Sequence, residues 1–412
     1  MIIRIAVLAI AISVMVMITA SSLITGFKKE IAEKIFGFWG HIHITDPGIG
    51  RSLTDALPID LDQPFYPELE QIEQVEYISR EKLFGRYLER ERVTRGGVRH
   101  VQAFVMYSGI IKAGDEMEGI LLKGIGPDFD WEFLSKYLVR GEPLRLTRDS
   151  SMSDGIIISE QTASRLRVDL GDRFSVVSIN SEYEQLERRF TVQGIYRTGL
   201  EEYDRQFALV DIRKLQQLLN WAPNQVTGFE VFLDDINDLE PIAEYIFFEE
   251  LPTELYAETI RTKMREIFEW LDLQDVNEVV IMSLMLLVAV INMITALLIL
   301  ILERTNMIGV LKSLGASNWS IRKVFLYYAA YIILIGLFWG NLLGIGLCWL
   351  QDTFGFITLD ETNYYLSVAP IRFNWWAILG LNIGTLLITL LFLIIPSYLV
   401  SRIDPVKAIR FK

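Results

Sequence analysis

The chain contains very little cysteine and histidine. Cys348 is the one cysteine among 412 residues, so no disulfide bond can form within a single chain. Two of the three histidines, His41 and His43, alternate along a predicted strand, which places both imidazoles on one face. A metal ion needs further ligands, and no other cysteine or histidine lies near this pair in the sequence. We therefore expect no metal site.

The motifs of common hydrolases are also absent. The sequence has no His-Glu-x-x-His, no Gly-x-Ser-x-Gly and no Gly-x-x-x-x-Gly-Lys-[Ser/Thr] phosphate loop. We expect no catalytic residues, no bound cofactor and no ATP hydrolysis by this chain. Its formal net charge of −13 disfavours nucleic acid as a partner, although such an excess is also typical of a solvated surface.

Hydrophobic residues, by contrast, make up 51% of the chain. They concentrate in four runs, each near or above the roughly 20 residues that cross a bilayer. The runs predict a membrane α-helical protein in a 1+3 arrangement, with a large α+β domain between the first and second helices. The predicted parts are transmembrane helices at 1–26, 276–302, 324–350 and 375–400, an outer domain with helical stalks at 27–275, a coupling helix and loop at 303–323, an outer loop at 351–374 and a tail at 401–412.

Charges next to the runs predict the orientation. Lysine and arginine in short loops stay on the cytoplasmic side, and they dominate the segment after the second run and the tail. Residues 27–275 instead carry an excess of 17 acidic residues, which predicts that they face outward. The first run, with Arg4 before it, also resembles a signal peptide. Its length and the apolar stripe of Phe27, Ile31 and Ile35 favour an uncleaved anchor that continues as a stalk.

A second stalk is predicted before the second run. Its apolar face has five members at helical spacing: Ile260, Met264, Ile267, Phe268 and Leu271. Two stalks at the base of one domain would couple its movement to the membrane. The same stripes are also what ordinary packing faces would show.

The outer segment alternates short helical and β-rich patterns, which predicts an α+β domain. Helices are expected near residues 66–72, 160–166, 212–219 and 239–247, and strands near 42–44, 102–106, 156–158, 173–179, 190–196, 207–210 and 229–233. The strands at 173–179 and 190–196 form a predicted hairpin with a charged, projecting tip at 180–189. A β-rich lobe over about 150–225 is expected to be inserted in the rest.

The segment after the second run, ERTNMIGVLKSLGAS at 303–317, is amphipathic. Ile308, Leu311 and Leu314 recur at three-residue spacing, and Gly315 is a typical helix stop. Such a helix can press into a partner protein at the membrane surface. It can equally lie in the lipid headgroups as a basic interfacial helix.

These residues resemble the signature of FtsX-like ABC transporter permeases, the family that includes the efflux protein MacB and the lipoprotein-releasing permeases LolC and LolE. The resemblance extends to Pro396 and to the tail, in Ser401-Arg402, Asp404-Pro405 and Ala408-Ile409-Arg410. Similarity to the LolC/LolE branch lies in TGFKKE at 25–30, IFGF at 35–38 with HIHI at 41–44, and TGLEEYD at 198–204.

The resemblance implies a mechanotransmitting (type VII) permease of the inner membrane, with a MacB-type periplasmic domain in a diderm bacterium. A separate cytoplasmic ABC ATPase, with ATP and Mg bound to it, would push the coupling helix. The implied coupling residues are Glu303, Arg304, Ile308, Gly309, Leu311, Lys312, Leu314, Gly315 and Ala316. Arg304 and Lys312 would meet the ATPase, and Gly309 and Gly315 would allow close backbone approach.

The implied cargo is lipoprotein, moved from the membrane lipid toward a periplasmic acceptor by this chain and a second permease subunit, either another copy or a paralogue. A LolA-like carrier would dock on the hairpin tip at Asn180, Tyr183 and Leu186, which is shorter and more charged than the LolC hook. Alternatives are a MacB-like efflux permease and an FtsX-like regulator of a periplasmic peptidoglycan hydrolase. The first usually carries its own ATPase domain, and the second typically has a much smaller outer domain.

Overall fold

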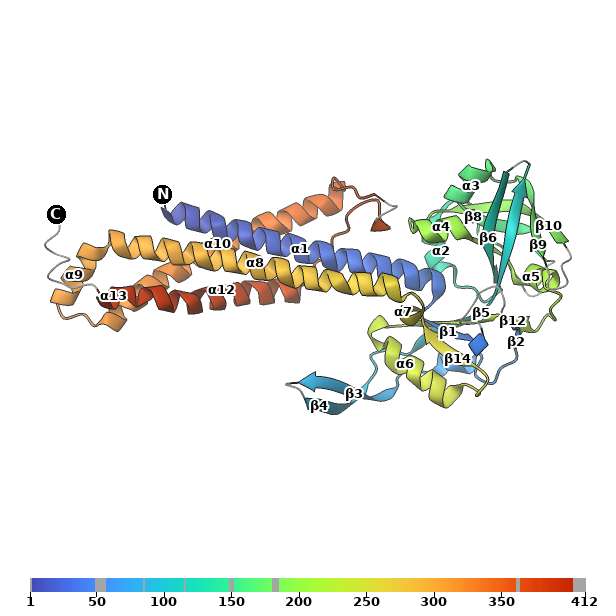
Figure 1. The fold of residues 1–412 in the computed structure, drawn as a ribbon, viewed down its shortest axis with the longest axis horizontal. Helices are drawn as coiled ribbons and strands as arrows, with labels where there is room; N and C mark the ends of the chain where they lie inside the picture. The colour runs from blue at the N-terminus through green and yellow to red at the C-terminus, as the bar shows by residue number, and fades with distance from the viewer. Residues whose placement is uncertain are drawn as a thin grey trace. The chain divides into compact units, whose positions relative to one another are not determined.

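The computed structural model describes residues 2–48, 57–83, 86–114, 116–147, 152–179, 185–360 and 364–402. The chain divides into two compact units. The helix unit consists of Met1–Glu30, Glu269–Leu359 and Val368–Lys412, and the sheet unit of Ile31–Phe268 and Asp360–Ser367. Figure 1 labels most of the helices and strands of both.

Four apolar helices dominate the helix unit. They are α1 (Ile2–Trp39), α8 (Arg265–Glu303), α10 (Asn318–Phe354) and α12 (Trp375–Ser397). By length and composition each can cross a membrane, which confirms the four predicted apolar helices. The first three are longer than the predicted spans, because polar residues at their ends continue the helix. Two short helices, α9 (Thr305–Ser313) and α13 (Leu399–Arg402), complete this unit among the described residues.

Close packing of α10 on α1 depends on three glycines spaced one turn apart. A Cβ atom at Gly336 would lie 2.7 Å from Cγ2 of Ile10, and one at Gly340 would lie 2.7 Å from Cβ of Val14. Gly344 faces Ile18 and Met15 in the same way. Small residues at this spacing let two helix backbones approach closely, which favours association in lipid.

Polar side chains join other helices of this unit. Asn341 of α10 and Asn382 of α12 exchange side-chain hydrogen bonds of 2.6 and 3.0 Å. Between α1 and α8, Ser21 donates to Glu278 at 2.7 Å, and the ammonium of Lys28 lies 2.6 Å from Asp275. Hydrogen bonds between helices are a common source of association where water is scarce.

The sheet unit is built on a ten-stranded sheet. Its path runs β14–β1–β13–β5–β6–β11–β8–β10–β7, and β9 pairs with both β10 and β5. The bounds are β1 (Ile42–Thr45), β5 (Val98–Ala113), β6 (Glu116–Ile125), β7 (Leu138–Gly141), β8 (Gly155–Ser159), β9 (Arg173–Ile179), β10 (Gln185–Tyr196), β11 (Phe207–Asp211), β13 (Gly228–Leu233) and β14 (Tyr256–Thr259). Two small sheets pair β2 (Ile59–Asp60) with β12 (Gln225–Val226), and β3 (Glu76–Leu83) with β4 (Arg86–Val93).

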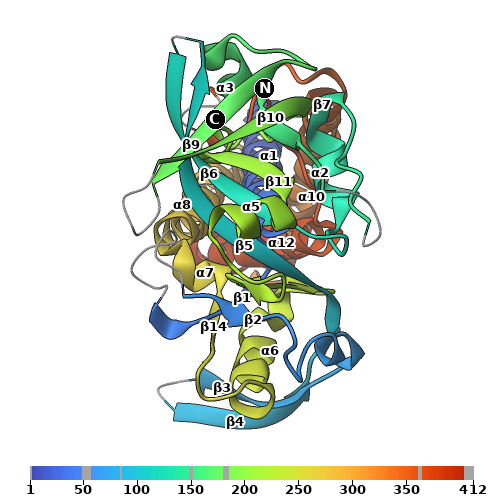
Figure 2. The same ribbon diagram turned by 90° about the vertical axis from the view of Figure 1, so that its right-hand side faces the viewer.

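Six strands of the large sheet close into a ring. β5 pairs with β6, β6 with β11, β11 with β8, β8 with β10, β10 with β9, and β9 returns to β5. Figure 2 labels β5, β6, β9, β10 and β11 in this part of the unit. The predicted lobe over about 150–225 supplies β8 to β11, but the ring also takes β5 and β6 from outside that segment. Closure leaves these strands without open edges.

The α+β prediction for this domain is confirmed, as are most of its elements. The helices are α2 (Trp131–Tyr137), α3 (Glu160–Leu166), α4 (Glu201–Gln206), α5 (Ile212–Leu218), α6 (Leu239–Tyr245) and α7 (Ile260–Lys263), with short helices at Glu68–Gln71, Ile236–Asp238 and Ile246–Glu250. The helical segment predicted at 66–72 is only a four-residue 3-10 helix, Glu68–Gln71. It ends where Ile72 takes extended backbone angles, φ −74° and ψ 101°.

The predicted hairpin is confirmed as β9 paired antiparallel with β10, but its tip is shorter than expected. β10 begins at Gln185, which pairs with Ile179, so residues 185–189 are strand rather than tip. The remaining tip residues, 180–184, lie outside the described residues.

Aromatic side chains fill the sheet unit near the end of α1. Phe38 stacks on Tyr203 with ring centroids 5.5 Å apart, and Trp39 meets Phe207 edge-on at 5.0 Å. Tyr203 belongs to the TGLEEYD segment, whose Asp204 accepts hydrogen bonds from Thr198 and Gly199 and so closes the turn. The stripes predicted for the two stalks are packing faces: Phe27, Ile31, Ile35, Ile260, Phe268 and Leu271 are buried.

Candidate functional site

The candidate coupling segment forms the short helix α9 between α8 and α10. The backbone of Arg304, with φ −101° and ψ 14°, separates α8 from α9. Thr305 donates its hydroxyl to the carbonyl of Leu302 at 2.7 Å. Gly315, with φ +89°, ends the helix, and the hydroxyl of Ser317 then accepts from the backbone of Ser320 to begin α10. The predicted helix and its glycine stop are both confirmed.

The exposed face of α9 differs from the predicted apolar stripe. Ile308 and Gly309 are buried, and Leu311 packs against the core of the helix unit. Of the predicted stripe only Leu314 is exposed, at 78% of its surface. Its exposed apolar neighbours are Met307 at 41% and Val310 at 45%. We call Met307, Val310 and Leu314 the α9 face.

Sequence reasoning missed Met307 and Val310, although both lie at helical spacing with Leu314. Two apolar stripes share this helix, and periodicity alone does not show which one the rest of the protein covers.

The charged residues of the segment have different surroundings. The ammonium of Lys312 donates to the backbone carbonyls of Val400 at 2.8 Å and Ser401 at 3.3 Å, so it ties α9 to α13. Arg304 is exposed. Glu303 lines a small cavity between α8, α10 and the beginning of α1, whose other walls are mostly apolar.

The remaining predicted residues of the segment, Gly315 and Ala316, serve the fold of this chain. A Cβ atom at Gly315 would meet no atom within 4 Å, so this glycine serves its backbone conformation rather than a close approach within the chain. Ala316 packs against the core of the helix unit.

The candidate carrier site on the hairpin has three predicted residues, in or next to the tip of the β9–β10 hairpin. Asn180 and Tyr183 are outside the described residues. Leu186 lies in β10 opposite Ser178 of β9, so its backbone is paired within the sheet.

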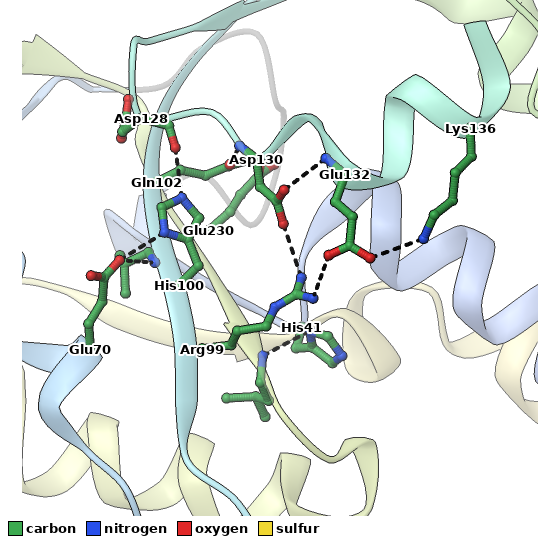
Figure 3. Close-up of polar contacts among 12 residues, drawn as sticks. His41, Glu70, Arg99, His100, Gln102, Asp128, Asp130, Glu132, Lys136 and Glu230 are labelled. Atoms are coloured by element: carbon green, nitrogen blue, oxygen red, sulfur yellow. Dashed lines mark hydrogen bonds and ion pairs between the residues drawn. The ribbon is translucent and has the colours of Figure 1, made fainter.

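The two histidines have separate surroundings in the sheet unit. The Nδ1 atom of His41 accepts from the backbone of Leu233 at 3.2 Å, and its ring stacks on Phe36. Burial lowers the pKa of His41 to about 4, with a smaller effect from the positive charge of Arg99. Figure 3 shows both side chains. Figure 3 also shows Arg99 bound to Asp130 and Glu132, at 3.1 and 3.4 Å.

His43 bonds instead to the end of α1. Its Nε2 atom lies 2.6 Å from the carbonyl of Trp39. In the part of the chain that the structure describes, no three histidine, cysteine or acidic side chains are grouped as metal ligands.

Comparison with known protein families defines the class. The model of the MacB-like periplasmic core domain matches residues 5–246, and that of the FtsX-like permease C-terminal region matches residues 279–405. The chain therefore belongs to the family of FtsX-like ABC transporter permeases with a MacB-like periplasmic core domain. The four apolar helices agree with an inner-membrane protein that carries a periplasmic domain.

Within that class, the chain is similar to curated permeases of lipoprotein-releasing systems. It is 22% identical to the lipoprotein-releasing system transmembrane protein LolC of Xylella fastidiosa, over 98% of this chain and 93% of the relative. It is 20% identical to LolE of Haemophilus influenzae, over 98% of this chain and 92% of the relative. Among solved structures, the extracellular domain of the ABC-type transporter YknZ from Gram-positive bacteria aligns with 39% of this chain and 81% of its own, with 14% identity and a TM-score of 0.28.

Proposed function

We propose that this chain is the permease subunit of a mechanotransmitting, type VII ABC transporter that releases lipoproteins from the inner membrane to a periplasmic acceptor. A separate ABC ATPase would bind ATP and Mg and would dock on the α9 face. A second permease subunit, another copy or a paralogue, would complete the transporter. The four spans would take the 1+3 arrangement, with α9 in the cytoplasm.

The observation that carries the proposal is the α9 face. Met307, Val310 and Leu314 form an exposed apolar patch on a short helix between two candidate spans. Such a patch suits a groove on a partner protein, because an amphipathic helix commonly binds by laying its apolar face into one. Lys312 and Ile308 fix the opposite side of α9 to the helix unit, so a push on α9 would reach α8 and α10.

The cargo is inferred from the likeness to LolC and LolE along nearly the whole chain. Both named relatives belong to lipoprotein-releasing systems. The proposed route also needs a soluble acceptor, because a released acyl chain is insoluble in water. A LolA-like carrier would fill that role.

The test is reconstitution in proteoliposomes with the partner ATPase, a triacylated lipoprotein and a soluble carrier. Lipoprotein in the soluble fraction is measured with ATP and Mg present. We expect ATP-dependent release by the wild-type chain. A wild-type complex that hydrolyses ATP without releasing lipoprotein would refute the proposed cargo, and the proteins that co-purify with it would indicate the alternative.

The α9 face is tested in the same assay. Leu314→Asp places a charge on the apolar patch and is expected to reduce release at least about tenfold, equivalent to roughly 1.4 kcal/mol. Leu314→Met keeps an apolar side chain and should release normally. Asp at Gly309 or Leu311 would be a poorer probe, because both pack within the helix unit. Normal release by Leu314→Asp would exclude this face as the docking surface.

A further inference from the structure

A buried ion pair lies in the sheet unit beside the end of α1. The ammonium of Lys123 on β6 is 2.7 Å from Oε1 of Glu230 on β13, and the two side chains are 1% and 0% exposed. The side-chain amide of Gln102 on β5 donates to the other carboxylate oxygen at 2.7 Å. Figure 3 shows Gln102 and Glu230 in this region. Three neighbouring strands thus meet at one charged group.

The same ammonium reaches the last turn of α1. Lys123 donates to the carbonyl of Phe38 at 2.8 Å, and it lies over the rings of Phe38 and Trp39. The final carbonyls of a helix have no partner within the helix, and they carry partial negative charge. The buried ammonium of Lys123 therefore holds the end of α1 through a directional hydrogen bond in addition to packing.

His43 on β1 connects the end of α1 to the beginning of the second stalk. Its Nε2 donates to the carbonyl of Trp39, and its Nδ1 accepts from the ammonium of Lys263 at 3.1 Å. This arrangement requires a neutral ring, and burial indeed lowers the pKa of His43 well below 6.5. Lys263 is the last residue of α7, and α8 begins two residues later at Arg265.

Two further contacts support the same connection. The backbone of Ile260, the first residue of α7, donates to the carbonyl of His41 at 3.0 Å. Tyr203 stacks on Phe38 and also places its hydroxyl against the sulfur of Met264. The end of α1 and the residues just before α8 are therefore held by the same strands.

Apolar side chains would fill this space without the cost of burying charge. A buried ion pair is weak evidence for stability, since well-packed apolar residues often replace one without loss. Hydrogen bonds additionally fix the relative orientation of the groups that they join. The arrangement is thus better explained by a need to hold both helices in one orientation than by stability.

We propose that Lys123, Glu230, His43 and Lys263 form a joint that fixes the end of α1 and the start of α8 on the sheet. They are positioning residues: a displacement of either helix moves the sheet instead of being lost as local bending. This inference rests on the proposed function, because it assigns these residues a part in coupling ATP hydrolysis to lipoprotein release.

The test compares two substitutions at His43 in the full chain, reconstituted with its ATPase. His43→Gln keeps one donor and one acceptor, whereas His43→Met removes both at similar volume. Lipoprotein released per ATP hydrolysed is expected to fall at least about tenfold in His43→Met and to stay within about threefold of wild type in His43→Gln. Val192→Ala creates a cavity at a buried position of β10. It is the control for a general loss of stability.

Hydrogen exchange gives a readout that does not depend on transport. The backbone amides of Gly40 and His41 bond to Phe36 and Val231, and they should exchange at least about tenfold faster in His43→Met. Amides of β8 should be unchanged. If His43→Met does not fold, Lys263→Met tests the other end of the joint.

Unchanged exchange and unchanged release per ATP in the tested variant would overturn the joint. Equal loss in the Val192→Ala control would also overturn it, because the effect would then be one of stability alone. Failure of the wild-type complex to release lipoprotein would instead refute the proposed function, and exchange would still report on the joint.

Discussion

Burial decides the protonation of single residues in the sheet unit, and His41 is the clearest case. Its ring accepts a hydrogen bond from Leu233 and stacks on Phe36, so a proton on Nδ1 would break one contact and bury a charge. The sequence predicted that His41 and His43 lie on one face of a strand, without a metal site, whereas β1 begins only at Ile42. The structure instead gives each ring its own hydrogen-bond partner.

The pKa of His41 predicts a pH dependence of stability. It falls from 6.5 to about 4 on folding, so between these values the folded state binds fewer protons than the unfolded state. Stability should therefore be fully present above pH 6.5 and decrease by up to about 3 kcal/mol as pH falls to 4. The measurement is the denaturant midpoint of the sheet unit in the detergent-solubilised chain. His41→Asn keeps a hydrogen-bond acceptor but does not titrate. If stability of this variant depended on pH as steeply as that of the wild type, the pH dependence could not be assigned to His41.

At the scale of single elements, α9 shows what a sequence pattern can and cannot predict. The amphipathic period of residues 303–317 predicted a helix, and α9 is there. Its exposed side could not be predicted, because the choice depends on distant residues: Lys312 bonds to α13, and Ile308 packs in the core of the helix unit. Likewise, Gly336, Gly340 and Gly344 are visible in the sequence as a repeated small-residue spacing, yet only the structure shows that they face α1.

The packing of α10 on α1 makes a testable prediction at this scale. Gly340→Ala places a methyl group 2.7 Å from Cβ of Val14 and should cost about 1–3 kcal/mol through overpacking. Gly346→Ala is the matched control, since nothing lies within 4 Å of its Cβ position. It should be neutral or stabilising by roughly 0.5–1 kcal/mol. Thermal unfolding of the detergent-solubilised variants separates the two, and equal shifts would argue against tight packing at Gly340.

For the whole molecule, the decisive question is which parts lie on each side of the membrane. The proposed 1+3 arrangement places α9 in the cytoplasm and the sheet unit in the periplasm. Both units carry exposed positions that are suitable for labelling, Ser313 on α9 and Ser164 on α3.

Labelling of single cysteines tests this arrangement in a Cys348→Ala background. In cells with a permeabilised outer membrane, an impermeant maleimide should label Ser164→Cys at once. Ser313→Cys should react only after the inner membrane is disrupted. Labelling of both positions in intact inner membranes would exclude the proposed topology, and the reverse order would invert the orientation.

Local patterns in the sequence determined the four apolar helices, the α+β domain and elements such as α3 and β9, because each depends on residues near one another in the chain. Only the tertiary structure decided the closed ring of strands, the exposed face of α9, the bond from Lys312 to Val400, and the joint around Lys123 and Glu230. Those features join residues that are far apart in the chain, and no local period or propensity encodes which distant groups will meet when the apolar surfaces are buried.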